Sequence, residues 1–176
     1  MTDTLFFFSK SADKLAGKGA NEIVKSTEKY KELNKIKDWR KVLSNLYFSP
    51  FSYDGKTYNS VEHAFQSKKI ELVDPEKAYW FTVESKNEIG LGDGLVARKN
   101  RKLVMLSEED LEKWSLIKSD ILKDILYQKF TQVEIAKNVL LNTCEAILLH
   151  GTRGIPIERQ YSLEKIREEI RDKLKN

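Results

Sequence analysis

The spacing of hydrophobic residues along the chain predicts several helices. Residues 114–130 have the clearest pattern, because isoleucine and leucine return every three to four positions, which is the period of an amphipathic helix. Two further helices are expected, over residues 134–142 and at the end of the chain. On the last helix, the stripe expected to be buried consists of Leu163, Ile166, Ile170 and Leu174. Nearer the N-terminus, Tyr30, Leu33 and Ile36 also keep helical spacing.

Short apolar runs predict a few strands between these helices. Residues 5–9 begin with four consecutive apolar residues, three of them aromatic, and residues 146–149 form a second apolar run. Asp54-Gly55 is a dipeptide favoured in tight type I′ turns, so it predicts a hairpin between residues 46–53 and 57–58. Together the elements predict an α+β fold that is compact and mostly helical, with a few short strands.

Length and composition set limits on the class of protein. A chain of 176 residues has the length of one domain, and we expect residues 1–176 to form a single one. It is 40% hydrophobic and 33% charged, a balance that excludes a disordered chain. No apolar run approaches the roughly 20 residues that a membrane span needs, and no signal peptide is recognisable. We therefore expect an intracellular protein, cytoplasmic or nuclear.

Few residues could hold a metal ion. The chain has two histidines and one cysteine, which excludes a cysteine-rich zinc site, and no histidine pair has the spacing of a zinc protease. A site built from His63, His150, Cys144 and a carboxylate remains conceivable. We nevertheless expect neither a metal ion nor another cofactor. The net charge of +4 permits an anionic ligand without requiring nucleic acid.

The most informative segment is a helix predicted over residues 61–72, for which Ser60 is a natural N-cap. Glu62, Gln66 and Lys69 are spaced i, i+4 and i+7, so they share one face of this helix. The helix dipole favours the ionised form of a carboxylate in the first turn. A solvated Glu–Lys face explains the same spacing. His63 is interpreted as a surface or capping side chain rather than a base.

Three other features each allow two interpretations. Trp114 follows an acidic run and is either a core residue or a platform on which a heterocycle stacks. The basic run at residues 98–102 is either a solvated turn or a patch that contacts phosphates. Lys18 lies between Gly17 and Gly19, either in an ordinary loop or close enough to a sugar C1 to form a Schiff base with the opened ring.

Taken in order, these segments resemble the NADAR family of YbiA-like N-glycosidases. The central matches are LSNLYFSPF at residues 43–51, Asp54-Gly55, and SVEHAFQ at residues 60–66. The order continues through Trp114, Lys129-Phe130, residues 140–143, residues 146–150, Arg153-Gly154 and residues 163–167. The opening Phe7-Phe8-Ser9 and Gly17-Lys18-Gly19 are similar to a subgroup found in eukaryotes and large viruses. The resemblance covers nearly the whole chain.

The resemblance implies an N-glycosidase that hydrolyses a bond between a ribosyl C1 carbon and a nitrogen. Its substrate would be either ADP-ribosylated guanine in nucleic acid, DNA or RNA, or a phosphorylated intermediate of riboflavin biosynthesis. We favour the nucleic acid because of the subgroup and because residues 10–41 carry ten basic against five acidic side chains. A non-catalytic module that binds ADP-ribose or a nucleotide is the alternative. Neither a membrane nor an obligate protein partner is expected.

The resemblance also assigns roles to individual residues. Glu62 would stabilise the oxocarbenium ion or activate water, and Lys18 would form an imine or bind phosphate. Substrate binding is assigned to Asn45, Gln66, Lys69, Trp114, Arg153 and Gly154. Within this set, Trp114 would stack on the base and Asn45 would bind ribose or base, whereas Gln66, Lys69 and Arg153 would position polar and phosphate groups. His150 stands where many bacterial members have glutamate, so no role for a second carboxylate is inferred.

Overall fold

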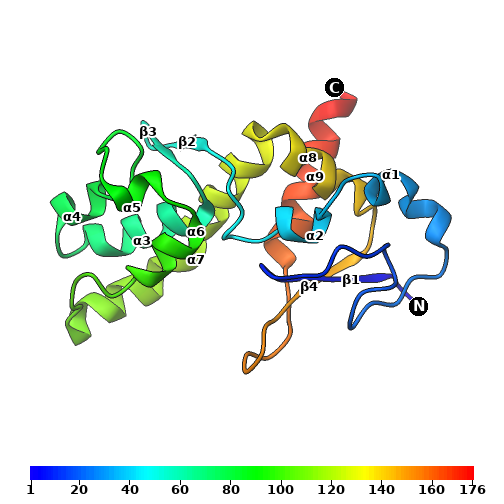
Figure 1. Ribbon diagram of the computed structural model, residues 1–176, viewed down its shortest axis with the longest axis horizontal. Coiled ribbons are helices and arrows are strands. Elements are labelled where there is room, and N and C mark those ends of the chain that lie inside the picture. Colours follow the sequence, from blue (N-terminus) through cyan, green and yellow to red (C-terminus); the bar gives the residue numbers. More distant parts are fainter. The chain divides into compact units, whose positions relative to one another are not determined.

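A computed structural model describes residues 1–176 (Figure 1). The strands are β1 (Thr4–Phe7), β2 (Phe51–Tyr53), β3 (Lys56–Tyr58), β4 (Ile147–His150) and β5 (Glu158–Arg159). The helices are η1 (Thr27–Tyr30), α1 (Lys31–Asn34), α2 (Trp39–Val42), α3 (Val61–Glu71), α4 (Pro75–Tyr79), α5 (Glu88–Leu91), α6 (Gly94–Lys99), α7 (Glu108–Gln132), α8 (Glu134–Asn142) and α9 (Tyr161–Lys175). This confirms a mostly helical α+β fold with a few short strands. None of the helices is both long and apolar enough to cross a membrane.

The chain divides into two compact units. The first unit consists of residues 1–44 and 134–176, and the second of residues 45–133. The single domain expected from the chain length stays a prediction.

In the first unit, the sheet has the order β1-β4-β5. Strands β1 and β4 are parallel, with Phe7 opposite His150, and β5 is antiparallel to β4. Because β1 and β4 are parallel neighbours, the segments that follow Phe7 and His150 leave the sheet at the same edge. Helix α9 packs against α8 and β4.

Three of the four residues expected to be buried on α9 are buried, but Leu174 is 67% exposed. The prediction was wrong for Leu174 because residues 172–176 are all exposed, so the last turn of α9 extends past the elements that cover the rest of the stripe.

The spacing of Tyr30, Leu33 and Ile36 does not produce one continuous helix. Tyr30 ends η1, Leu33 lies in α1, and Ile36 falls in the turn that precedes α2. Asp38 has a φ of 56°, in the left-handed region that a right-handed helix cannot contain. The apolar spacing still identifies core residues, because Tyr30 and Leu33 are fully buried.

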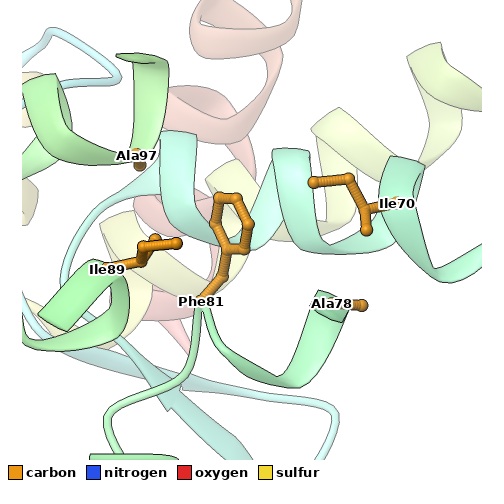
Figure 2. Packing of buried hydrophobic residues seen from close by; sticks show 5 residues of the cluster. All are labelled: Ile70, Ala78, Phe81, Ile89 and Ala97. Carbon is orange, nitrogen blue, oxygen red and sulfur yellow. The ribbon is translucent and has the colours of Figure 1, made fainter. Parts of the chain in front are cut away.

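In the second unit, α3 packs against α4, α6 and α7, and the β2–β3 hairpin packs on α7. Figure 2 shows part of the core, in which the ring of Phe81 lies among Ile70 of α3, Ala78 of α4, Ile89 of α5 and Ala97 of α6. The hairpin confirms the predicted turn, since Asp54 and Gly55 have φ values of 52° and 75°. Residues 46–50 were expected to extend the first strand but lie outside it.

The sequence pattern predicted that helix α7 starts at Trp114. The helix in fact begins six residues earlier, at Glu108. Ser107 is the N-cap, and it forms a capping box with Asp110. The acidic run is therefore the first turn of the helix, where the helix dipole favours negative charge. The apolar face is buried at Ile125 and Leu126 but becomes partly exposed toward its N-terminal end.

Candidate functional site

The N-terminus of α3 fixes the position of Glu62. The Ser60 side chain accepts a hydrogen bond from the His63 backbone N–H at 3.2 Å, as expected of an N-cap. The backbone N–H of Glu62 donates to the carbonyl of Asn45 at 3.0 Å. Two of the donors left open at the start of a helix are thereby satisfied. Asn45 and Glu62, which are 17 positions apart in sequence, are joined through the main chain.

Glu62 and Gln66 form a polar pair on α3. The Gln66 side-chain amide donates from Nε2 to Glu62 Oε1 at 2.9 Å, while Glu62 Oε2 accepts no hydrogen bond from the protein. Gln66 is buried, and its Oε1 has no hydrogen-bond partner. Exchanging the nitrogen and oxygen positions of the Gln66 amide would place its oxygen against the Glu62 carboxylate, where two acceptors would face each other. The opposite amide orientation therefore does not give Gln66 Oε1 a partner. A buried acceptor without a partner is uncommon in proteins, and here it lies next to the candidate catalytic carboxylate.

Lys69 lies on the same face of α3 and is half-buried. Burial is the main influence that lowers the pKa of its ammonium, the charge of Arg101 lowers the pKa further, and the charge of Glu62 raises it. Glu62, Gln66 and Lys69 therefore form a continuous polar face, as the spacing predicted. A fully solvated Glu–Lys face does not describe it, because Gln66 is buried and Lys69 is half-buried.

Trp114 contributes to the core of the second unit. Its side chain is 6% exposed, and its ring lies 5.0 Å from the ring of Phe65, centre to centre, at an angle of 51°. Phe65 belongs to α3 and directly precedes Gln66 in the sequence. The pair therefore joins the candidate helix to α7. Stacking of Trp114 on a base remains a prediction.

The other predicted residues belong to the first unit. Lys18 is exposed in the segment that follows β1, and Arg153 and Gly154 are exposed between β4 and β5. Because β1 and β4 are parallel, both segments leave the same edge of the three-stranded sheet. Gly154 has a φ of 82°, which favours glycine. The predicted residues are thus divided between the two units, with Lys18, Arg153 and Gly154 in the first and the others in the second.

Sequence reasoning missed the residue that organises the Lys18 loop, Glu22. Its side chain is fully buried, and its Oε1 accepts hydrogen bonds from the backbone N–H groups of Gly17 and Gly19, both at 3.0 Å. Its Oε2 accepts from the backbone N–H of Phe6 at 3.0 Å. The carboxylate therefore ties the glycines on both sides of Lys18 to strand β1.

Arg40 of α2 completes this arrangement. Its guanidinium donates to both Glu22 carboxylate oxygens, at 2.9 and 2.7 Å, and to the carbonyl of Leu15 at 2.9 Å. A Cβ atom at Gly19 would lie 2.8 Å from Glu22 Oε1, so glycine is required there for space. Neither Glu22 nor Arg40 belongs to a periodic pattern. The only sequence signal is an acidic residue close to a Gly-Lys-Gly run within a basic segment.

His63 is a structural residue. It is fully buried, which corrects its interpretation as a surface side chain, although its backbone takes part in the cap. Its Nε2–H donates to the carbonyl of Ile89 at 2.8 Å, so Nδ1 accepts from the hydroxyl of Ser60 at 2.7 Å. This neutral tautomer satisfies both ring nitrogens and links α3 to α5. Burial also lowers the pKa of His63.

We expect the protein to lose stability as the pH falls below about 6.5, the ordinary pKa of histidine. Burial lowers the folded-state pKa of both His63 and His150. The two neutral histidines contribute stability at a pH above their unfolded-state pKa. This contribution is lost as the pH falls toward their folded-state pKa values, because the unfolded chain then binds more protons than the folded chain. Urea unfolding between pH 5 and 8 measures this effect. An NMR titration that gave His63 a pKa of 6.5 or higher in the folded protein would contradict it.

The chain contains no group of three or more His, Cys, Asp or Glu side chains placed to hold a metal ion. His63 lies in the second unit, whereas Cys144 and His150 lie in the first.

Comparison with known proteins identifies the family. The fold is similar to the NMR structure of the E. coli protein YbiA, with a TM-score of 0.57 and 19% sequence identity over 100% of this chain and 90% of that chain. No curated protein matches the sequence significantly. The family model for the NADAR domain matches residues 30–153, which is more than half of the chain and includes Asn45, Glu62 and Trp114. The chain therefore belongs to the NADAR family.

Proposed function

We propose that this protein is a metal-independent N-glycosidase that hydrolyses the bond between a ribosyl C1 carbon and a nitrogen. The NADAR family is generally associated with hydrolase or N-glycosidase activity, and the ribosyl bond and the independence from metal are our proposal. The observation that carries the proposal is the Glu62–Gln66 pair, in which one carboxylate oxygen is held by the amide and the other accepts no hydrogen bond from the protein. The unpartnered Gln66 Oε1 beside it supports a polar cluster that a ligand or water completes.

The chemistry of the reaction fits such a carboxylate. Cleavage of the C1–N bond develops positive charge on the ribose, and a fixed carboxylate stabilises that charge. The same carboxylate can take a proton from the attacking water. Gln66 orients the carboxylate by donating a hydrogen bond to Glu62 Oε1. Glu62 Oε2 is therefore the atom available for either role. The base leaves with a proton, and water supplies the new hydroxyl on C1.

ADP-ribosylated guanine in nucleic acid is the substrate we favour. The basic segment at residues 10–41 supports contact with a phosphate backbone. If this segment contributes, affinity for the nucleic acid should fall steeply as salt concentration rises. Affinity that does not change with salt would count against nucleic acid.

Product analysis tests the proposal. Single-stranded DNA carrying ADP-ribosylated guanine is incubated with the protein, and the products are identified by mass spectrometry. Release of free ADP-ribose and recovery of unmodified guanine are expected. If neither appears, phosphorylated intermediates of riboflavin biosynthesis are tested next. Binding without cleavage of either class would support the alternative of a non-catalytic module that binds ADP-ribose or a nucleotide.

Lys18 is proposed as a second catalytic group. Its amine would attack C1 as the base leaves with a proton, and the ring would open to give an imine, which water hydrolyses to restore the lysine. Cyanoborohydride reduces such an imine to a stable amine, so mass spectrometry should find the sugar adduct on Lys18. Lys18→Arg keeps the positive charge and should abolish the adduct. Lys14→Arg, another exposed lysine four positions earlier, is the control. An adduct that persists in Lys18→Arg would show that another amine forms it and would overturn the catalytic role of Lys18, which leaves phosphate binding as the alternative.

A further inference from the structure

A cavity in the second unit combines positive charge with an apolar surface. Its volume is about 530 Å³, within the range of roughly 300–1,000 Å³ typical of small-molecule sites. Three cationic side chains line it, Lys69 from α3 and Arg101 and Lys102 from the segment after α6. The rest of the lining is apolar and includes Val104 and Leu111.

The three cations share this cavity without an anionic partner. None of them forms an ion pair with a carboxylate. Arg101 donates one hydrogen bond, to the carbonyl of Arg98 at 3.0 Å, and the other guanidinium donors stay available. The charges of Lys69 and Arg101 repel each other, as the effect of Arg101 on the pKa of Lys69 shows. An anion in the cavity would relieve this repulsion and accept charge-assisted hydrogen bonds.

The apolar part of the lining favours an anion attached to a larger group. Met105 also lines the cavity and is 90% exposed. A flexible, polarisable methionine side chain adapts well to an aromatic ring or to the carbon face of a sugar. A simple inorganic anion would leave this surface unused.

The cavity also adjoins the candidate catalytic face. Lys69 lies two turns along α3 from Glu62, and the two charges interact. A ligand that contacts Lys69 from the cavity is therefore close to the Glu62–Gln66 pair. The basic run at residues 98–102, which the sequence left open between a solvated turn and a phosphate contact, supplies two of the three cations.

We propose that this cavity binds the phosphate or diphosphate group carried by the ribose of the substrate, through Arg101 and Lys102 together with Lys69. The proposal rests on the function proposed for Glu62 and specifies a ribose phosphate ester as the chemical class. Both candidate substrates, ADP-ribosylated guanine and the phosphorylated intermediates, carry such a group. Arg101 and Lys102 are then binding residues in addition to those that the family resemblance assigns.

Calorimetric titration of ADP-ribose tests the proposal in the double variant Arg101→Gln/Lys102→Gln. Loss of two charge-assisted contacts should weaken binding by about tenfold or more. Lys118→Gln/Lys123→Gln is the matched control, because it removes the same charge from exposed positions on α7 and should bind as the wild type does. Adenosine lacks the phosphates, so it should bind the wild type more weakly than ADP-ribose does. The two double variants should bind adenosine with equal affinity.

Equal affinity of the two double variants for ADP-ribose would overturn the proposal, as would wild-type protein that does not bind ADP-ribose better than adenosine. Cleavage is measured separately. If the wild type cleaves its substrate and the Arg101→Gln/Lys102→Gln variant has an unchanged KM, the cavity proposal fails and the glycosidase function stands. If nothing is cleaved but binding depends on Arg101 and Lys102, the cavity proposal stands and the glycosidase function fails.

Discussion

Replacing Glu62 with glutamine is expected to reduce kcat by about 10²- to 10⁴-fold while leaving substrate affinity within a few fold of the wild type. Glutamine has nearly the same shape and can still hydrogen-bond to Gln66, so helix α3 and its cap should stay intact. It cannot stabilise positive charge on the ribose or take a proton from water. Release of base is followed by mass spectrometry, and affinity is measured by calorimetry with ADP-ribose.

Glu71→Gln is the matched control for this variant. Glu71 is the last residue of the same helix, and its exposed carboxylate lies 3.5 Å from the Lys68 ammonium. Exposed ion pairs contribute little to stability, so this change should alter neither kcat nor affinity. A Glu62→Gln variant that loses affinity and turnover together would indicate a binding role for Glu62. A variant that keeps full turnover would remove Glu62 from the mechanism.

The sequence predicted best the elements whose signals are local. The Ser60 cap, the helix after it and the Asp54-Gly55 turn each depend on a few neighbouring residues, and the structure confirms all three. The face shared by Glu62, Gln66 and Lys69 follows from helix geometry alone. These features could be predicted because their physical causes lie within one or two turns of the chain.

The start of α7 was missed although its signal is local. It was placed at Trp114, where apolar periodicity begins, whereas the capping box of Ser107 and Asp110 determines the first turn. Features that depend on distant partners were not predicted. The short helices α4, α5 and α6 bury their few apolar residues against α3 or one another. The buried state of His63 depends on a carbonyl 26 positions away, at Ile89. None of these contacts has a periodic signature in the sequence.

The contact most remote from any sequence pattern is the buried pair of Glu22 and Arg40. Their side chains are fully buried or nearly so, and the shortest distance between the charged groups is 2.7 Å. The sequence left Gly17-Lys18-Gly19 open between an ordinary loop and a segment that brings Lys18 close to a sugar C1. In the structure, the backbone N–H groups of both glycines donate to the Glu22 carboxylate. The position of Lys18 is therefore determined by a residue that periodicity and composition did not identify.

Glu22→Gln is expected to destabilise the first unit by about 3–5 kcal/mol, the usual cost of breaking a buried ion pair by removing one charge. The carboxylate oxygens accept from Phe6, Gly17, Gly19 and Arg40, whereas the glutamine NH₂ group would face some of these donors and the Arg40 charge would lose its partner. Urea unfolding measures the loss, with Glu28→Gln as the control because that exposed carboxylate lies 3.3 Å from Lys31.

Hydrogen exchange of individual amides locates the effect. The Gly17 and Gly19 amides should exchange much faster in Glu22→Gln than in Glu28→Gln, since their acceptor is weakened and the loop opens locally. The imine trapped on Lys18 should decrease at temperatures where the variant is still folded, because the lysine is no longer held in one position. Unchanged exchange at both glycines, together with wild-type stability, would contradict the role assigned to Glu22. Faster exchange of the two glycine amides, together with as much trapped imine as in the wild type, would show that Glu22 has a structural role only.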